Sequence, residues 1–184
     1  MQNTFTIQFN SDIAKDNTEI RIAFYANIGF FIEIAQMLEF NLRKLICYEL
    51  SVERIEECEL TKENVSTICD EFDTYYKGTY SEKWTLGSLL GGIEKLPSLT
   101  PEITSIIKEI STYRNILIHK IFQNNIITQN LESADTVNDY IEHYLIPKTN
   151  QAKNLNDFVI NIINIFRDTL HDYKKQVGLP IPND

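Results

Sequence analysis

Glycine, proline and cysteine are scarce in this 184-residue chain, which contains six, five and three of them. With 43% hydrophobic and 23% charged residues, the composition is otherwise that of an ordinary globular protein, and it excludes disorder over most of the length. The chain is long enough for one domain with a full core and too short for two comfortable ones. We therefore expect a single domain over residues 1–184.

The three cysteines exclude a structural zinc site. Cys47, Cys58 and Cys69 are odd in number, lack C-x-x-C spacing and have no histidine nearby that would complete a tetrahedral set of ligands. We interpret them as reduced, partly buried thiols of a cytosolic protein. No other set of metal ligands is visible, and we expect neither a metal nor a cofactor.

A targeting segment and a long apolar run are also missing. Residues 1–16, MQNTFTIQFNSDIAKD, have neither the basic nor the apolar region of a secretory signal. The longest apolar stretch, IAFYANIGFFI, lies between Arg21 and Glu33 and is shorter than the about 20 residues that span a bilayer. We expect a soluble, cytoplasmic protein with no membrane partner.

Positive charge is the minority sign, with 17 Lys and Arg residues against 26 Asp and Glu residues and a net charge of −9. Because affinity for a phosphate backbone rests on clustered Lys and Arg, this balance excludes a protein that coats DNA without sequence preference. A small phosphate site remains compatible with the sequence, since residues 101–122 carry three cations against two acids.

Helical periodicity fills most of the chain. From Glu19 to Leu50, hydrophobic residues recur at alternating steps of four and three, which predicts a long helix packed in a bundle. Thr61 and Thr100 are the expected N-caps of two more helices, the second with a proline at its first position. The expected later helices cover residues 61–77 with Gly78 as the stop, a stretch around Gly87 and Gly91, and residues 101–122, 131–145 and 154–176, with Pro147 at the last junction.

The two ends of the chain lack this periodicity. Residues 1–18 are polar with a short apolar alternation, which is typical of an extended arm or an edge strand but too short to specify a sheet, and we expect an extended arm. Residues 178–184 are expected to form a disordered tail.

One arginine interrupts the apolar face of the helix expected over residues 101–122. Arg114 is the only polar member of this face. The positions follow steps of four and three: Ile103, Ile107, Ile110, Arg114, Leu117 and Ile121. Burying a guanidinium without a partner is costly. We expect Arg114 to pair with a carboxylate of the first helix, such as Glu33 or Glu39, to extend to solvent, or to face a polar group such as a second subunit or a phosphate.

Two further polar residues follow Arg114. Asn115 and His119 lie four positions apart and share a helix face, whereas Arg114 and His119 point about 140° apart on an ideal helix. These two side chains converge only where the helix loosens near FQNN, or where a two-fold axis sets two copies of the helix side by side.

The run YRNILIHKIF, which follows a helix beginning TLGSLL and a proline-capped helix start, resembles the signature of the HEPN superfamily, the higher eukaryotes and prokaryotes nucleotide-binding domains. Members share an all-α bundle and an Arg, usually followed by Asn, Asp or His, that precedes a His by four to six residues. Arg114, Asn115 and His119 fit this motif with its shortest spacing. The resemblance implies an all-α, HEPN-like up-and-down bundle of four to six helices with a short N-terminal extended arm.

The resemblance also implies a metal-independent endoribonuclease of the toxin or phage-defence type. Its RNA substrate would be cleaved by 2′-OH attack at a composite site between the two subunits of a homodimer. Two copies of His119 would supply the acid and the base, Arg114 a planar fork for phosphoryl oxygens, and Asn115 an orienting group. The tyrosine that accepts an inactivating nucleotide in some family toxins is Ile121 here, which leaves Tyr113 or a protein antitoxin of a different mechanism.

Two other interpretations stay open. The first is a non-catalytic HEPN-like helical module that binds a nucleotide or a protein partner, with Arg114 in an interface ion pair. The net charge of −9 favours this module, whereas the intact Arg, Asn and His favour the ribonuclease. The second is a generic all-α regulatory domain in which the motif occurs by chance.

Overall fold

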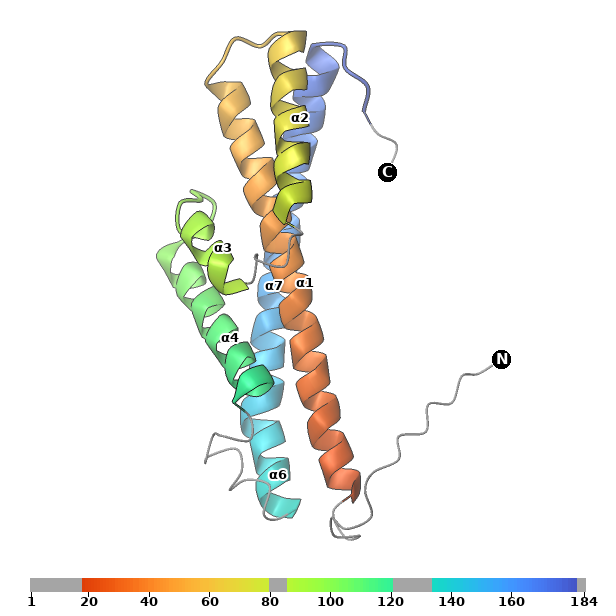
Figure 1. Ribbon diagram of the computed structural model, residues 1–184, viewed down its shortest axis with the longest axis vertical. Coiled ribbons are helices and arrows are strands. Elements are labelled where there is room, and N and C mark those ends of the chain that lie inside the picture. The colour runs from red at the N-terminus through yellow and green to blue at the C-terminus, as the bar shows by residue number, and fades with distance from the viewer. Residues whose placement is uncertain (1–17, 80–85, 121–133, 182–184) are drawn as a thin grey trace, which may run out of the picture.

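The structure is a computed structural model that describes residues 18–79, 86–120 and 134–181 (Figure 1). Every element in these ranges is helical, which confirms the predicted all-α class. The expected N-terminal arm lies outside the described residues. The elements are α1 (Thr18–Glu56), α2 (Lys62–Thr79), α3 (Leu86–Ile93), α4 (Pro101–His119), α6 (Ala134–Tyr140), a π-helical segment (Ile141–Leu145) and α7 (Ile146–Gln176).

The two longest helices, α1 and α7, lie side by side, run in the same direction and form the spine of the molecule (Figure 1). Asn41 Nδ2 donates to Asn156 Oδ1 at 2.8 Å, and further along both helices the Tyr173 hydroxyl donates to Glu56 at 3.0 Å. Both α2 and α4 run antiparallel to α1 (Figure 1). The long helices therefore alternate in direction as in an up-and-down bundle, except that α2 and α4 run the same way with α3 between them.

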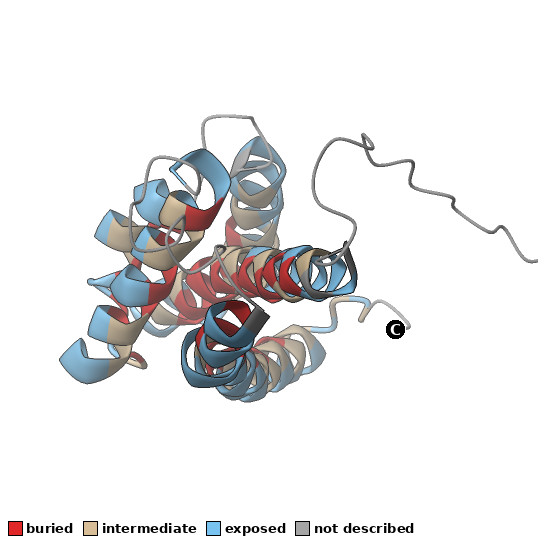
Figure 2. Ribbon diagram, turned by 90° about the horizontal axis from the view of Figure 1, so that it is seen from below, coloured by how far each residue is buried: buried red, intermediate tan, exposed pale blue. Residues whose placement is uncertain are grey.

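The core follows the predicted seam of the first helix. Every member of that seam is buried: Phe24, Ile28, Phe31, Ala35, Leu38, Leu42 and Leu45. Buried residues lie on the inner faces of the helices (Figure 2), and each fully buried Leu or Phe stabilises the fold by about 1.5–3 kcal/mol. Beyond the expected end at Leu50, α1 continues to Glu56 because Val52 and Ile55 join a second, smaller cluster with α2 and α7.

The last long helix begins earlier than predicted. We expected a junction at Pro147 and a helix start at Asn154, but α6, the π-helical segment and α7 form one continuous helical run. Pro147 lies in the first turn of α7, where a missing N–H is tolerated. The wider turn of the π-helical segment comes just before the start of α7. The proline therefore interrupts neither that segment nor α7.

Two glycines also depart from expectation. Gly78 lies inside α2 instead of ending it. Gly178, placed in a disordered tail, instead ends α7 with φ at +70°, a conformation that favours glycine. The following Leu179 donates its N–H to Lys174 O at 2.8 Å, the bond of a Schellman motif, and its side chain packs against the second cluster. The chain just after Gly178 is therefore part of the fold.

The solvent side of α1 carries apolar side chains as well. Ile22, Tyr25, Phe30, Met37 and Phe40 are between 38% and 51% exposed. Together with the core face, they make Arg21–Glu56 long and apolar enough to cross a membrane by length and composition, with a mean hydropathy of 1.2. The core helix of a soluble protein meets the same criterion.

Candidate functional site on α4

The start of α4 is fixed to the spine. Thr100 Oγ1 accepts the N–H of Ile103 at 3.4 Å, and Pro101 occupies the first turn, as predicted. Just before this cap, Ser98 donates through its N–H at 2.9 Å and through Oγ at 2.5 Å to the two oxygens of Glu49 on α1. Burial raises the pKa of the Glu49 carboxyl, and the two bonds from Ser98 oppose that shift.

The rotation of α4 is set by Tyr113. Its ring packs edge-on against Phe31 of α1, with 5.1 Å between the ring centroids. Its hydroxyl lies 2.8 Å from the hydroxyl of Tyr140 on α6. Burial, followed by this hydrogen bond, raises the pKa of Tyr113 above the ordinary value. Because Tyr113 is held on two sides, the direction of the neighbouring Arg114 is held as well.

Arg114 pairs with Glu39, one of the two carboxylates expected for it. Its Nη1 lies 4.0 Å from Oε2 of Glu39, and the other carboxylate oxygen accepts a hydrogen bond from Arg43, one turn further along α1. These three side chains, the Arg43–Glu39–Arg114 cluster, are 11–16% exposed. Glu33, the other expected partner, is exposed and lies outside the cluster.

Among the described residues, the cluster sets two guanidinium groups against one carboxylate, in a chain whose net charge is −9. Arg114 uses little of its donor capacity. The 4.0 Å separation from Glu39 is longer than a hydrogen bond, and the buried Nε of Arg114 has no hydrogen-bond partner among the described residues. Arg114 is therefore only weakly bonded to the described part of the chain.

The structure places Asn115 and His119 on the exposed face of α4. Neither side chain makes a hydrogen bond or an ion pair with another described residue. His119 is the last residue of α4, and the N–H of Lys120 closes the helix by bonding to Ile116 O. The regular helix keeps His119 and Arg114 on different sides, as predicted, so one copy of the chain does not bring them into contact.

A cavity that the sequence did not indicate lies where α1, α2 and α7 meet. It has a volume of about 340 Å³, and Lys44, Lys174, Cys47 and Cys69 are among its lining residues. The lining comes from the consecutive helices α1 and α2 and from α7, which is far from both in the sequence, and each contributes residues at ordinary helical spacing. No local motif therefore signals this cavity.

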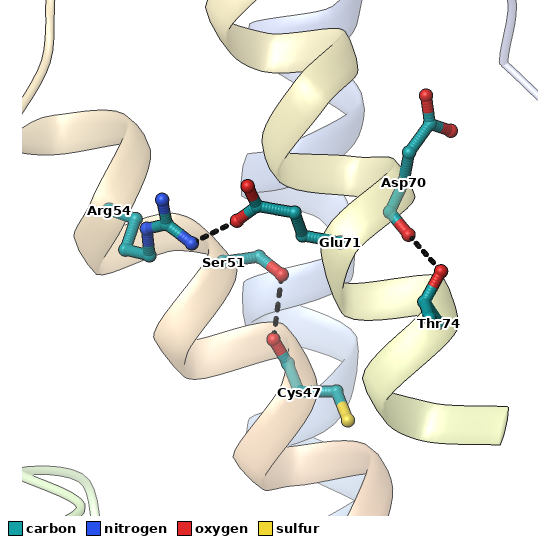
Figure 3. Close-up of polar contacts among 6 residues, drawn as sticks. All are labelled: Cys47, Ser51, Arg54, Asp70, Glu71 and Thr74. Carbon is teal, nitrogen blue, oxygen red and sulfur yellow. Dashed lines mark hydrogen bonds and ion pairs between the residues drawn. The ribbon is translucent and has the colours of Figure 1, made fainter. Parts of the chain in front are cut away.

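Figure 3 shows polar contacts of α1 and α2 beside this cavity. Arg54 of α1 pairs with Glu71 of α2, and Ser51 Oγ donates to the carbonyl oxygen of Cys47 at 2.7 Å. Burial, with a smaller effect from Asp73, raises the pKa of the Cys47 thiol to about 12. Cys47 is therefore a packing residue and not a nucleophile at neutral pH. All three cysteines are free thiols, and Cys58 and Cys69 are partly buried, as expected.

Comparison with protein-family models, curated proteins and solved structures gives no match for this chain. The resemblance to the HEPN superfamily therefore rests on the motif and the helical composition alone. Within the described ranges, no three His, Cys, Asp or Glu side chains are grouped so that they would hold a metal ion.

Proposed function

We propose that this chain is a metal-independent endoribonuclease of the HEPN type, acting in the cytoplasm as a homodimer in a toxin or phage-defence setting. The observation that carries the proposal is the surplus guanidinium in the Arg43–Glu39–Arg114 cluster. Glu39 is already bonded to Arg43, and Arg114 Nη1 lies 4.0 Å from Glu39, beyond hydrogen-bond distance, so the terminal N–H groups of Arg114 would bind the phosphate of an RNA strand. The guanidinium of Arg114 would attract a phosphate at short range, against the repulsion that a net charge of −9 predicts.

The motif residues suit cleavage by in-line attack. The 2′-oxygen of a ribose attacks phosphorus, the bond to the 5′-oxygen breaks, and the products carry a 2′,3′-cyclic phosphate and a 5′-hydroxyl. His119 of one copy would take the proton of the 2′-hydroxyl, and His119 of the second copy would give a proton to the leaving 5′-oxygen. Arg114 would stabilise the charge on the pentacovalent phosphate, and Asn115, on the same face as His119, would orient the imidazole or the phosphate.

Two copies are necessary in this mechanism. Arg114 and His119 of one α4 lie on different sides of the helix, so His119 of a second α4 has to approach Arg114 across a two-fold axis. A protein antitoxin is proposed as the partner that keeps this site inactive. Its contact with the chain would cover the exposed end of α4, where Asn115 and His119 are accessible.

Cleavage of a short fluorescently labelled RNA by the purified protein tests the proposal. Activity should persist in EDTA and leave 2′,3′-cyclic phosphate ends, because no step requires a metal ion. His119→Ala should lower the rate by about 10²- to 10⁴-fold, whereas the matched control His143→Ala, at an exposed position outside the motif, should not. Full activity of His119→Ala, or 3′-hydroxyl product ends, would refute the ribonuclease.

A second candidate function is the non-catalytic module, and the ion pair between Arg114 and Glu39 favours it. Here Arg114 balances a carboxylate within its own chain, and the exposed face of α4 binds a nucleotide or a protein partner. Arg114→Lys separates the two functions. An ammonium group satisfies an ion pair at 4.0 Å, but it does not reproduce a planar fork on a phosphate, so only the ribonuclease predicts a large loss for this variant.

A further inference from the structure

The cavity where α1, α2 and α7 meet has the size of a small-molecule site. Its volume of about 340 Å³ lies near the lower end of the range of about 300–1,000 Å³ that ligand pockets occupy. Because a cavity of about 150 Å³ holds one benzene, this cavity has room for roughly ten to twelve non-hydrogen atoms. Its described lining residues all lie on these three helices, so the cavity is separate from the candidate site on α4.

The cavity wall contains an apolar side chain from each of the three helices. Tyr48 of α1, Phe72 of α2 and Leu170 of α7 line it, and all three also pack against the second core cluster. The ring of Phe72 is further held by Tyr75, which packs edge-on with 6.4 Å between the ring centroids. These side chains are fixed by contacts within the fold, so they offer a preformed apolar surface to a ligand.

Lys174 adds a positive charge to this wall. Its ammonium group lies beside the thiol of Cys69: burial raises the pKa of that thiol, and the charge of Lys174 opposes the shift. Lys174 is half-buried and forms no ion pair with an Asp or Glu of the described residues, whereas the adjacent Lys175 pairs with Asp172 at 3.3 Å. Because a thiol is only a weak acceptor, the described fold leaves Lys174 without the charged partner that would stabilise a partly buried cation.

The two acidic residues of the wall leave Lys174 unpaired. Asp73 pairs with Lys77, one turn further along α2, at 3.3 Å. The carboxylate of Asp70 points away from α1 (Figure 3). Both acidic side chains are exposed, so each is also in contact with water. Neither carboxylate therefore lies within ion-pair distance of the ammonium group of Lys174.

Two further nitrogen-bearing side chains line the cavity. His171 precedes Lys174 by three residues, which places both on the same face of α7. Lys44 of α1 has its ammonium group 4.5 Å from the centre of the Phe40 ring, so its charge is already engaged in a cation–π contact. The positive edge of the cavity is therefore formed by α7, with Lys174 as its main charge.

We propose that this cavity binds a small organic carboxylate whose apolar body contains about eight to ten carbon atoms. The carboxylate accepts hydrogen bonds from Lys174, and the apolar body lies against the rings of Tyr48 and Phe72. A hydrogen bond from an ammonium group to a carboxylate is about twice as strong as a neutral one, so the carboxylate replaces the thiol of Cys69 as the partner of Lys174. No arginine is among the described lining residues, which disfavours a phosphate, since the planar fork of arginine matches phosphate oxygens.

The net charge of −9 does not prevent this binding. At physiological ionic strength, exposed charges more than about 8 Å apart are largely screened from each other, so a single carboxylate in the cavity responds mainly to the nearby ammonium group. A larger anion would instead approach many acidic side chains at once. The net charge therefore favours a small ligand with one negative charge at this site.

Three probes that share a tail but differ in head group test the inference: octanoate, 1-octanol and octylammonium. Isothermal titration calorimetry of the full chain should give one site for octanoate, with a dissociation constant on the order of 100 µM for a ligand of this size. Octanol and octylammonium should each bind at least about tenfold more weakly, because only octanoate brings a negative charge to Lys174.

Lys174→Gln and Lys175→Gln are a matched pair of variants, because each removes one positive charge from the same turn of α7. Lys174→Gln should weaken octanoate binding at least about tenfold and leave octanol binding unchanged. Lys175→Gln, outside the cavity, should change the octanoate affinity less than about twofold. Thermal unfolding without a probe verifies that both variants stay folded.

Protection of a thiol locates the bound probe. Cys58 and Cys69 are both partly buried, but of the two Cys69 alone lines the cavity. At an octanoate concentration of about ten times the dissociation constant, alkylation of Cys69 by iodoacetamide should slow about tenfold, whereas that of Cys58 should not change. Mass spectrometry of the partly alkylated native protein measures both rates.

Three results would each overturn the inference. The first is the absence of octanoate binding up to about 5 mM, far above the expected dissociation constant. The second is equal binding of the three probes, or of octanoate by wild type and Lys174→Gln, which indicates apolar adsorption without recognition of charge. The third is equal protection of Cys58 and Cys69, or protection of neither, which places the probe outside the cavity. None of these results bears on the proposed ribonuclease, whose motif residues lie on α4.

Discussion

Glu39→Gln keeps the shape of the side chain but removes the carboxylate of the Arg43–Glu39–Arg114 cluster. The guanidinium groups of Arg43 and Arg114, whose side chains are 11% and 16% exposed, would then lie near each other without the carboxylate of Glu39. Breaking a buried ion pair by removing one partner costs about 3–5 kcal/mol. Because the cluster keeps some contact with water and glutamine still accepts a hydrogen bond, we expect the lower end, about 3 kcal/mol of unfolding free energy.

Removing Arg114 should be far less damaging. Arg114→Met leaves a neutral pair between Arg43 and Glu39, and the methionine fills the space of the arginine stem. The lost contact is a 4.0 Å ion pair without a hydrogen bond, and the cost of burying a guanidinium with an unpartnered Nε is removed with it. We expect a change below about 1 kcal/mol in either direction. Glu33→Gln is the matched control, since it makes the same chemical change at an exposed position of the same helix.

Urea unfolding monitored by far-UV circular dichroism measures these differences in unfolding free energy. An equal dependence of that free energy on urea concentration in all variants confirms that the unfolded state is unchanged. The expected order of destabilisation is Glu39→Gln first, with Arg114→Met and Glu33→Gln both small. If Arg114→Met destabilises the protein as much as Glu39→Gln, then Arg114 is a full partner of Glu39. The surplus guanidinium on which the proposed ribonuclease rests would not exist.

Three further predictions concern the hydroxyl pair of Tyr113 and Tyr140, the carboxyl of Glu49 and the thiol of Cys47. Tyr113→Phe or Tyr140→Phe alone should cost about 1–2 kcal/mol in urea unfolding, because each leaves a partly buried hydroxyl unpaired, and the double change should cost less than the sum. Burial raises the folded-state pKa of Glu49 above its unfolded value near 4.5, so the stabilising contribution of this carboxyl is complete below that pH and is lost as the pH rises. Wild type should therefore lose stability relative to Glu49→Gln as the pH rises above about 4.5, and parallel pH profiles would contradict this. Cys47, with its pKa raised to about 12 by burial and by Asp73, should be the slowest of the three thiols to react with iodoacetamide, which mass spectrometry of partly alkylated native protein measures.

The helices of the fold could be predicted wherever the pattern that specifies them lies within a few residues. The apolar period of α1 and the caps at Thr61 and Thr100 depend on positions three or four apart, and all appear in the structure. Pro147 and Gly178 were misread because tertiary contacts decide their roles. Pro147 lies in the first turn of a helix that follows a π-helical segment, and Gly178 is held by the packing of the residue after it.

The candidate site could be predicted only in part. The need for a counter-charge reduced the partners of Arg114 to Glu33 or Glu39, but the choice depends on how α4 is rotated, which the contacts of Tyr113 decide. Arg43 was missed, although its signal is present: it follows Glu39 by four residues, the spacing of an ion pair within one helix. That pair changes the chemistry of the site, because it occupies the carboxylate that Arg114 was expected to use alone.

A substitution at position 114 tests stability and function separately. It belongs to a face of isoleucines and leucines, and an apolar side chain of similar volume would fill it without burying a second positive charge. We expect an arginine there to contribute little to folding, and binding sites are where such residues are expected. If Arg114→Met is as stable as the wild-type protein and no longer cleaves RNA, the guanidinium acts on the phosphate. If that variant keeps its stability, its dimer and its partners, then Arg114 has no role in the site, and only the generic helical domain remains.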